Sequence, residues 1–359
     1  MPRELGPPDM IGRLTGGRRS ARLLLALGAL SSLLIAAGIA TRVDALSGIG
    51  SLAALAYVLV LSLLLAREVI EDRSRLDAAW REVANGAEPT LRRGLGASFP
   101  VRVLAVVVLV AITATLAVVV LRDGWWLLAF SVVPAVALLF AWRTRLTTRA
   151  WIAGSVVAAA MLAVETVFRD NLLGGLVLGA VIAPQVMAGV VLLDASRLAR
   201  VWLLEGRPWA AGRAFALGCL LAVPPTLMNV SGMRAELASA GEASFQSAWM
   251  ALYALQPALL EESWARLFLL PLLYVAFRST TGSTTGRALL AALLLSVAVH
   301  GLAHAPQSIA SVTNALFTAL VFGVPLALLF LRRGLESAIG YHFFIDLVRF
   351  GYVILVLRS

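Results

Sequence analysis

Residues 255–277 read LQPALLEESWARLFLLPLLYVAF, an apolar run that contains two adjacent glutamates and an arginine. The run is long enough to cross the hydrocarbon core of a bilayer as a helix, which takes roughly 20 residues. A charged side chain at the centre of a bilayer costs at least about 2.5–3.5 kcal/mol, so charges in such a run need partners or a function. This stretch therefore predicts a membrane protein whose helices enclose polar groups.

The composition of the whole chain agrees with a membrane protein. Of its 359 residues, 60% are apolar and 14% are charged, whereas soluble domains are about 45–50% apolar and about a quarter charged. These proportions exclude a soluble enzyme, a disordered chain and a disulfide scaffold. The single cysteine, Cys219, excludes a structural disulfide and a cysteine-based metal cage. The net charge of +10 predicts no nucleic-acid partner, because the arginines lie between apolar runs and form no patch.

Apolar runs recur along the chain and predict about eleven transmembrane helices. Because lipid offers no partner to unpaired backbone groups, helix is the expected conformation, and the predicted fold is an all-α polytopic membrane protein. The longest run exceeds one straight span, so we expect it to be kinked, tilted or divided. The runs lie at 23–40, 46–66, 103–121, 125–142, 150–168, 172–193, 214–230, 247–277, 288–304, 314–331 and 337–357.

The placement of the arginines predicts the orientation of these helices. If the N-terminus is cytoplasmic, alternate connections should be rich in arginine, and 23 of the 30 basic residues lie in those connections, against five on the opposite side. All basic residues are arginine, a bias typical of GC-rich bacterial genomes. We therefore expect a multi-pass protein of a bacterial plasma membrane. The arginine-rich connections are 1–22, 67–102, 143–149, 197–213, 278–287 and 332–333.

We expect two parts along the chain. An N-terminal accessory bundle over 1–209 includes a cytoplasmic amphipathic helix at about 67–86, where apolar residues recur at roughly heptad spacing between many charges. We expect this helix to lie on the membrane or on its neighbours, and a docking face for a partner is the alternative. A helical core over 210–359 follows. The pair Pro224-Pro225 predicts a kink near its start.

Ionisable residues inside apolar runs are concentrated near the C-terminus. They form three short motifs at 261–266 (EESWAR), 300–304 (HGLAH) and 342–346 (HFFID), which contain all three histidines of the chain. Residues four apart share one face of a helix. Each of the three helices therefore presents a polar stripe, and the stripes avoid lipid only by facing one another. The predicted result is one buried polar pocket with the composition of a hydrolytic site, in which a base activates water and donors hold an oxyanion.

The first motif divides into two parts. Glu262 and Arg266 are four residues apart and are expected to neutralise each other on one helix face. Glu261 is turned by about 100° from its neighbour, so it is free to face another helix.

The three motifs resemble the CPBP family of intramembrane peptidases, also called the Abi or CAAX-protease family. Its pattern is Glu-Glu-x-x-x-Arg, then Phe-x-x-x-His, then His-x-x-x-Asn or Asp. The matching residues are Glu261, Glu262 and Arg266 for the first element, His304 for the second, and His342 and Asp346 for the third. His300 stands where the family has phenylalanine. The resemblance covers roughly residues 245–357 and implies a CPBP-like helical core.

The resemblance implies an intramembrane endopeptidase that hydrolyses a peptide bond in a membrane-associated or lipidated protein. It implies that Glu261 is the base that activates water and that His304 assists it. His342 and Asp346 would stabilise the developing oxyanion or complete the water site. The two other residues of the first element would form a supporting ion pair. The expected partners are the lipid bilayer and a membrane protein or lipidated peptide as substrate.

Several alternatives stay open at this stage. The reaction is either metal-free and driven by the glutamate, or assisted by one divalent ion such as Zn²⁺, for which the candidate ligands are Glu261, His300, His304 and His342. A catalytically silent membrane protein with a binding or immunity role is an alternative function. A proton- or ion-coupled transporter also uses such residues, and buried polar groups also tie helices together.

Overall fold

The computed structural model describes residues 18–41, 44–71, 125–239, 248–280, 284–304 and 309–356. Within these ranges the chain is helical apart from short connections, and it forms no strand, which confirms the predicted all-α fold. Seven helices of the described part are long and apolar enough to cross a membrane. The number of eleven stays a prediction. The run at 103–121, and all of the predicted amphipathic helix after residue 71, lie outside the described ranges.

Ten of the eleven predicted apolar runs fall on helices. The elements are α2 (Arg18–Thr41), α3 (Asp44–Glu71), α7 (Trp125–Ala141), η2 (Arg143–Arg145), α8 (Thr148–Arg169), α9 (Leu172–Ser196), α10 (Pro208–Ser239), η3 (Ala248–Ala254), α11 (Leu255–Glu262), η4 (Ser263–Leu269), α12 (Leu270–Thr280), α13 (Thr285–Ala303), α14 (Ile309–Thr318), η5 (Ala319–Gly323), α15 (Val324–Arg333) and α16 (Leu335–Val356).

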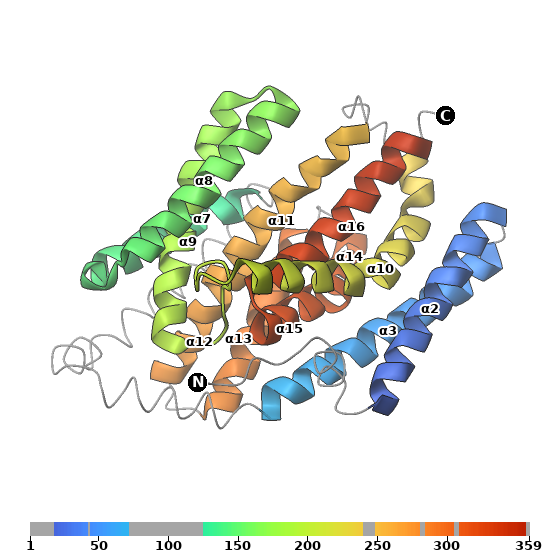
Figure 1. Cartoon of the computed structure of the whole chain (residues 1–359), viewed down its shortest axis with the longest axis horizontal. Helices are drawn as coiled ribbons and strands as arrows, with labels where there is room; N and C mark the ends of the chain where they lie inside the picture. The colour runs from blue at the N-terminus through green and yellow to red at the C-terminus, as the bar shows by residue number, and fades with distance from the viewer. Residues whose placement is uncertain are drawn as a thin grey trace.

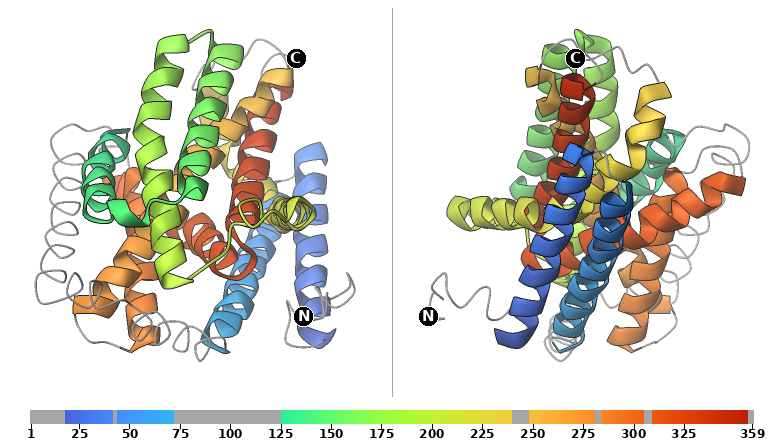
Figure 2. Two further views of the ribbon diagram at one scale, coloured as in Figure 1. Left: turned by 60° about the vertical axis from the view of Figure 1, so that its left-hand side comes forward. Right: turned by 90° about the vertical axis from the view of Figure 1, so that its right-hand side faces the viewer.

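The C-terminal helices lie between two groups of N-terminal helices. The antiparallel pair α2–α3 covers one side, and α7, α8 and α9 cover the other (Figures 1 and 2). The accessory helices therefore flank the core. The proposed boundary between residues 209 and 210 itself stays a prediction.

Helix α10 crosses the core and changes direction along its length (Figure 1). Its continuous helix contains Pro224 and Pro225, and proline removes a hydrogen bond and clashes with the carbonyl four residues earlier. Before this point α10 packs closely against α16. A Cβ added at Gly218 would collide with the backbone oxygen of Ser337. The close crossing therefore requires a residue without a side chain at that position.

The longest apolar run forms one uninterrupted helical stretch that changes its winding. It passes from the 3₁₀-helix η3 through α11 into the π-helix η4, and continues as α12. The π-helical segment ends two residues before Pro271, and a second one, η5, ends two residues before Pro325. Proline has no N–H for the carbonyl of the preceding turn, and widening the helix just before it relieves the clash. Single-turn π segments inside α-helices are frequent at functional sites.

Polar contacts group the helix ends as the arginine placement predicts. Glu68 at the end of α3 pairs with Arg332 and Arg333 at 3.1 and 3.3 Å. The indole of Trp202 donates to the backbone oxygen of Arg333 at 2.6 Å. These residues belong to three connections that the sequence places on one side of the membrane. The cytoplasmic assignment of that side stays a prediction.

Residues near the opposite ends of the helices also meet. The hydroxyl of Tyr253 donates to Glu165 at 2.7 Å and accepts from Arg169 at 3.3 Å. This contact ties α8 to the start of the motif-bearing helical stretch. The ring of Tyr253 also packs beside Phe350 near the end of α16, with centroids 6.4 Å apart.

Candidate active site

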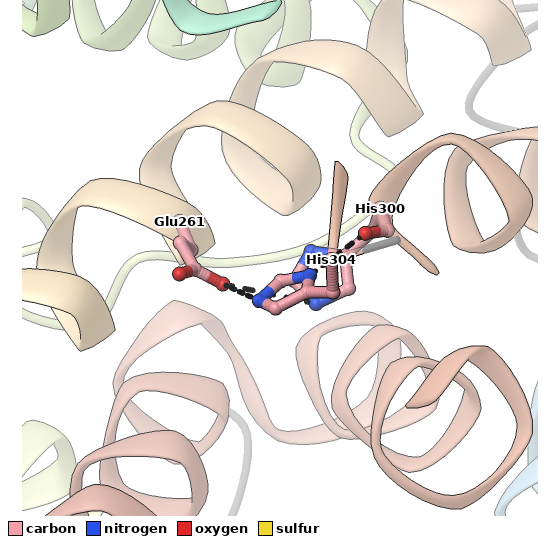
Figure 3. A group of neighbouring side chains, drawn as sticks. All are labelled: Glu261, His300 and His304. Atoms are coloured by element: carbon pink, nitrogen blue, oxygen red, sulfur yellow. Dashed lines mark hydrogen bonds and ion pairs between the residues drawn. The ribbon is translucent and has the colours of Figure 1, made fainter. Parts of the chain in front are cut away.

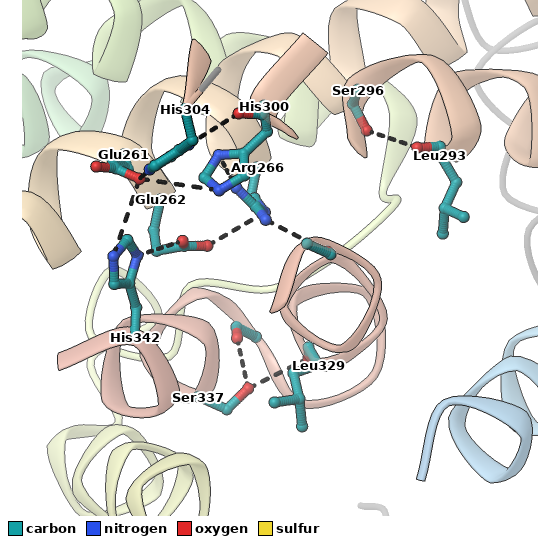
Figure 4. A network of polar contacts seen from close by, with 12 residues as sticks. Glu261, Glu262, Arg266, Leu293, Ser296, His300, His304, Leu329, Ser337 and His342 are labelled. Atoms are coloured by element: carbon teal, nitrogen blue, oxygen red, sulfur yellow. Dashed lines mark hydrogen bonds and ion pairs between the residues drawn. The ribbon is translucent and has the colours of Figure 1, made fainter. Parts of the chain in front are cut away.

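The three sequence motifs meet in the interior of the C-terminal helices. The glutamates end α11 and the arginine lies on η4, while two histidines come from the end of α13 and the third from α16. Figure 4 shows their side chains turned toward one another. Asp346 joins them through His342, one turn earlier on α16.

Glu261 lies at the centre of this group. Its Oε2 atom is 3.3 Å from Nε2 of His304, 3.8 Å from Nε2 of His300 and 3.9 Å from Nε2 of His342. Figure 3 shows the carboxylate turned toward His300 and His304. The side chains of Glu261 and His304 retain 22% and 38% of their exposure, so the group reaches the surface at this point.

Glu262 and Arg266 are fully buried and contact the histidines that face Glu261. The guanidinium lies 3.3 Å from Glu262 Oε2, as the four-residue spacing predicts. It donates from Nη1 to Nδ1 of His300 at 2.8 Å and from Nη2 to the backbone oxygen of Gly323 at 3.3 Å. The other oxygen of Glu262 lies 2.9 Å from Nδ1 of His342. This one ion pair therefore orients two of the three imidazoles.

Each histidine uses its Nδ1 atom for support and turns its Nε2 atom toward Glu261. His304, which directly follows α13, donates from Nδ1 to the backbone oxygen of His300 at 2.9 Å. Nε2 of His342 also lies 3.3 Å from Oδ2 of Asp346. The rings of His300 and His304 are in contact, with centroids 4.7 Å apart.

Negative charge exceeds positive charge in this group. Three carboxylates, those of Glu261, Glu262 and Asp346, face one guanidinium, that of Arg266. Uncompensated charge is costly in a protein interior. Two imidazolium groups, or one divalent cation, would restore neutrality. The site therefore favours binding of protons or of a cation.

One subset has the composition of a metal site. One oxygen of Glu261 and one nitrogen each of His300 and His304 lie within 4.8 Å of one another. The fourth candidate ligand, His342, is 3.9 Å from the same glutamate. Imidazole and carboxylate are the usual protein ligands of a catalytic zinc ion.

Sequence reasoning missed two contributors. The backbone oxygen of Gly323 accepts from Arg266, and the ring of Trp264 stacks on His300 with centroids 6.5 Å apart. The sequence signal for the Gly323 carbonyl was Pro325 within an apolar run. Proline has no backbone N–H, so it leaves a carbonyl of the preceding turn without its helical partner. Trp264 lies within the first motif, but its spacing alone does not reveal its partner.

Comparison with known families gives one match. Residues 243–348 match the model of the family described as type II CAAX prenyl endopeptidase Rce1-like. This confirms the resemblance to the CPBP family over the region that contains all three motifs. Comparison with curated proteins and with solved structures gives no match.

Proposed function

We propose that this Rce1-like region hydrolyses a peptide bond in a membrane-associated or lipidated protein, with Glu261 as the base that activates water. The observation that carries the proposal is the convergence of three imidazole Nε2 atoms on one glutamate oxygen at 3.3–3.9 Å. Among the described residues, that buried oxygen receives no hydrogen bond of good geometry. An oxygen in this state is able to accept a hydrogen bond from a water molecule. The family match supports the same reaction.

In the proposed reaction, a water molecule gives one proton to Glu261 and its oxygen attacks the scissile carbonyl carbon. His304 lies 3.3 Å from the carboxylate and exchanges protons with it. When the C–N bond breaks, the same proton passes to the nitrogen of the leaving amine. The protein thus returns to its starting state, and a general base and acid of this kind contributes typically about 10²–10⁴-fold in rate.

His342 and Asp346 have a different task in this proposal. The carboxylate of Asp346 lies 3.3 Å from Nε2 of His342, and it stabilises the protonated form of that ring. A protonated His342 donates toward the oxyanion that forms on the substrate. Preorganised donors of this kind stabilise developing charge strongly in a site that excludes water.

The same residues would also accommodate a divalent ion such as Zn²⁺, for which Glu261 and its neighbouring histidines are the candidate ligands. When bound, the ion would supply a more acidic water and polarise the substrate carbonyl. Elemental analysis of the purified protein, with His304→Ala as the comparison, separates the two forms of the reaction. Stoichiometric metal that is lost in the variant supports metal assistance. Full activity after chelation, with little metal present, supports the metal-free form.

The test of the proposal compares two glutamates that lie among the helices. Glu261→Gln and Glu165→Gln each replace one carboxylate oxygen by an amide, and Glu165 belongs to the separate contact with Tyr253. Each variant is reconstituted in liposomes with a quenched fluorescent farnesylated CAAX peptide, and membranes that contain each protein are compared by proteomics for cleavage products. We expect Glu261→Gln to lose about 10²–10⁴-fold in rate with an unchanged melting temperature, and Glu165→Gln to cleave as the parent does.

The alternatives predict other outcomes. If Glu261 only ties helices together, its substitution lowers the melting temperature. The variant and the parent then give the same cleavage products. If the protein is a transporter, the same change alters proton-coupled flux in the liposomes. Equal product patterns for the parent and Glu261→Gln in both assays would overturn the peptidase proposal.

A further inference from the structure

We propose that His300 is a positioning residue: a neutral imidazole, held in one tautomer by Arg266, that directs its Nε2–H at the reactive oxygen of Glu261. The inference rests on the proposed function and deepens it. It concerns the position at which this chain has histidine and the family pattern has phenylalanine. It also assigns His300 a role other than metal ligation.

The contact with Arg266 fixes the tautomer. Nη1 of the guanidinium lies 2.8 Å from Nδ1 of His300, and every polar hydrogen-bonding atom of a guanidinium is a donor. Nδ1 must therefore accept, which leaves it without a hydrogen. In a neutral imidazole the hydrogen then sits on Nε2, and a doubly protonated ring would place two donors against each other.

The three nitrogens that face Glu261 are therefore not equivalent. His304 and His342 donate from Nδ1, to the backbone oxygen of His300 and to the carboxylate of Glu262, respectively. When neutral, both present the lone pair of Nε2 to Glu261, so both are free to accept a proton. His300 presents a hydrogen instead. It is the member of the group whose Nε2 serves as a donor in the resting neutral state.

Burial holds the ring of His300 in place. The residue is 2% exposed and lies between the indole of Trp264 and the ring of His304. Turning the imidazole over would remove Nδ1 from Arg266 and leave a buried guanidinium hydrogen unpaired. The Nε2–H is therefore a fixed dipole 3.8 Å from Glu261 Oε2. It orients the carboxylate directly after a small shift, or through one water molecule.

The same tautomer is incompatible with metal ligation by His300. A ligating nitrogen needs its lone pair, and Nε2 carries a hydrogen while Nδ1 is occupied by Arg266. His304 and His342 have the arrangement typical of metal-bound histidines, in which the second nitrogen donates to a carbonyl or a carboxylate. If the protein holds an ion, its histidine ligands are thus His304 and His342.

Nitrogen-15 NMR of histidine-labelled protein in nanodiscs tests the tautomer. The chain contains three histidines, so the spectrum is simple, and His300→Phe assigns the signal by its loss. We expect His300 to show a bare Nδ1 and a protonated Nε2 in protein prepared with and without Zn²⁺. A protonated Nδ1, or a shift of the His300 signals on addition of Zn²⁺ that marks direct ligation, would overturn the inference.

Kinetics test the positioning role with two variants. His300→Phe keeps an aromatic ring and removes the donor, whereas His300→Gln keeps an N–H at a similar distance from the backbone. We expect His300→Phe to lower kcat about fivefold with KM unchanged, because one hydrogen bond is worth about 1 kcal/mol, and to retain the metal content of the parent. His300→Gln should recover part of kcat. Parental kcat in a folded His300→Phe variant would show that the ring only packs.

The inference and the proposed function fail in different ways. If Glu261→Gln is inactive and His300→Phe is fully active, the peptidase proposal stands and the positioning role does not. If the parent cleaves nothing, the NMR measurement still tests the tautomer, because it needs no substrate.

Discussion

Two carboxylates in this molecule, those of Glu165 and Glu261, lie among helices but in contrasting surroundings. Glu165 is 3% exposed and accepts from the hydroxyl of Tyr253 at 2.7 Å, with Arg169 next to that hydroxyl. The side chain of Glu261 is 22% exposed, and its Oε2 atom faces three imidazoles at 3.3–3.9 Å. The first carboxylate has a short hydrogen bond. The second has several longer contacts with groups that exchange protons.

The difference separates a structural carboxylate from a reactive one. A short, directional hydrogen bond satisfies a buried oxygen and ties two helices together. Longer contacts to several proton-exchanging groups leave the oxygen able to bind water or a substrate. Polar residues in apolar helices thus indicate function most strongly when their partners are titratable and incompletely satisfied. The two sites allow matched variants that test this distinction.

The largest effect on stability should come from the arginine of the reactive site. Arg266→Met removes the partner of Glu262, the donor to His300 and the donor to Gly323. Breaking a buried ion pair on one side typically costs about 3–5 kcal/mol. We expect a loss of that size in the free energy of unfolding, measured by denaturant titration in detergent micelles, together with loss of cleavage.

Arg169→Met is the matched change at the structural site. Arg169 is exposed at the end of α8, and exposed charged contacts are worth about 0–1 kcal/mol. A loss below that limit is expected, with cleavage retained. If both arginine variants lose stability equally, the contrast between the two sites is wrong.

A smaller effect is expected from the tyrosine of the structural site. Tyr253→Phe removes the donor to Glu165, and a buried group left without its partner costs about 1–3 kcal/mol. Thermal unfolding should detect this loss while the rate of cleavage stays parental. Tyr341→Phe is the control, because the buried hydroxyl of Tyr341 has no hydrogen-bond partner among the described residues, and it should change stability little. A reduced kcat in Tyr253→Phe would show that this site is coupled to catalysis.

The sequence predicted the elements of the site better than their mutual arrangement. Ten of the eleven apolar runs expected from the sequence fall on helices of the structure. The four-residue spacing correctly predicted the contact between Glu262 and Arg266. Periodicity describes one helix at a time, so it does not define which nitrogen of His342 meets which glutamate. The acceptor at Gly323 was missed for a related reason, since a backbone carbonyl leaves no mark on hydropathy.

The π-helical segments η4 and η5 were predictable from the sequence only in part. Pro271 and Pro325 are visible in the sequence, and each predicts a disturbed helix nearby. How the disturbance is relieved depends on tertiary packing. A Cβ added at Gly189 on α9 would lie 2.5 Å from the backbone oxygen of Leu267, so α9 approaches η4 closely only because this residue is glycine. Such an approach becomes evident once both helices are placed.

The smallest effect should come from Asp346, the carboxylate of the reactive site that lies on α16. Asp346→Asn keeps an oxygen that accepts from His342 and adds an amide that donates to an oxyanion, while it removes one of three negative charges. Because neutral hydrogen bonds are worth about 1 kcal/mol, we expect the cleavage rate to stay within about tenfold of the parent. Asp194→Asn, at the exposed contact with Arg149, is the control and should cleave at the parental rate. A loss of cleavage rate for Asp346→Asn as large as that for Glu261→Gln would mean that the reaction needs two ionised carboxylates. The contrast with Glu165 would then hold for Glu261 and Asp346 together.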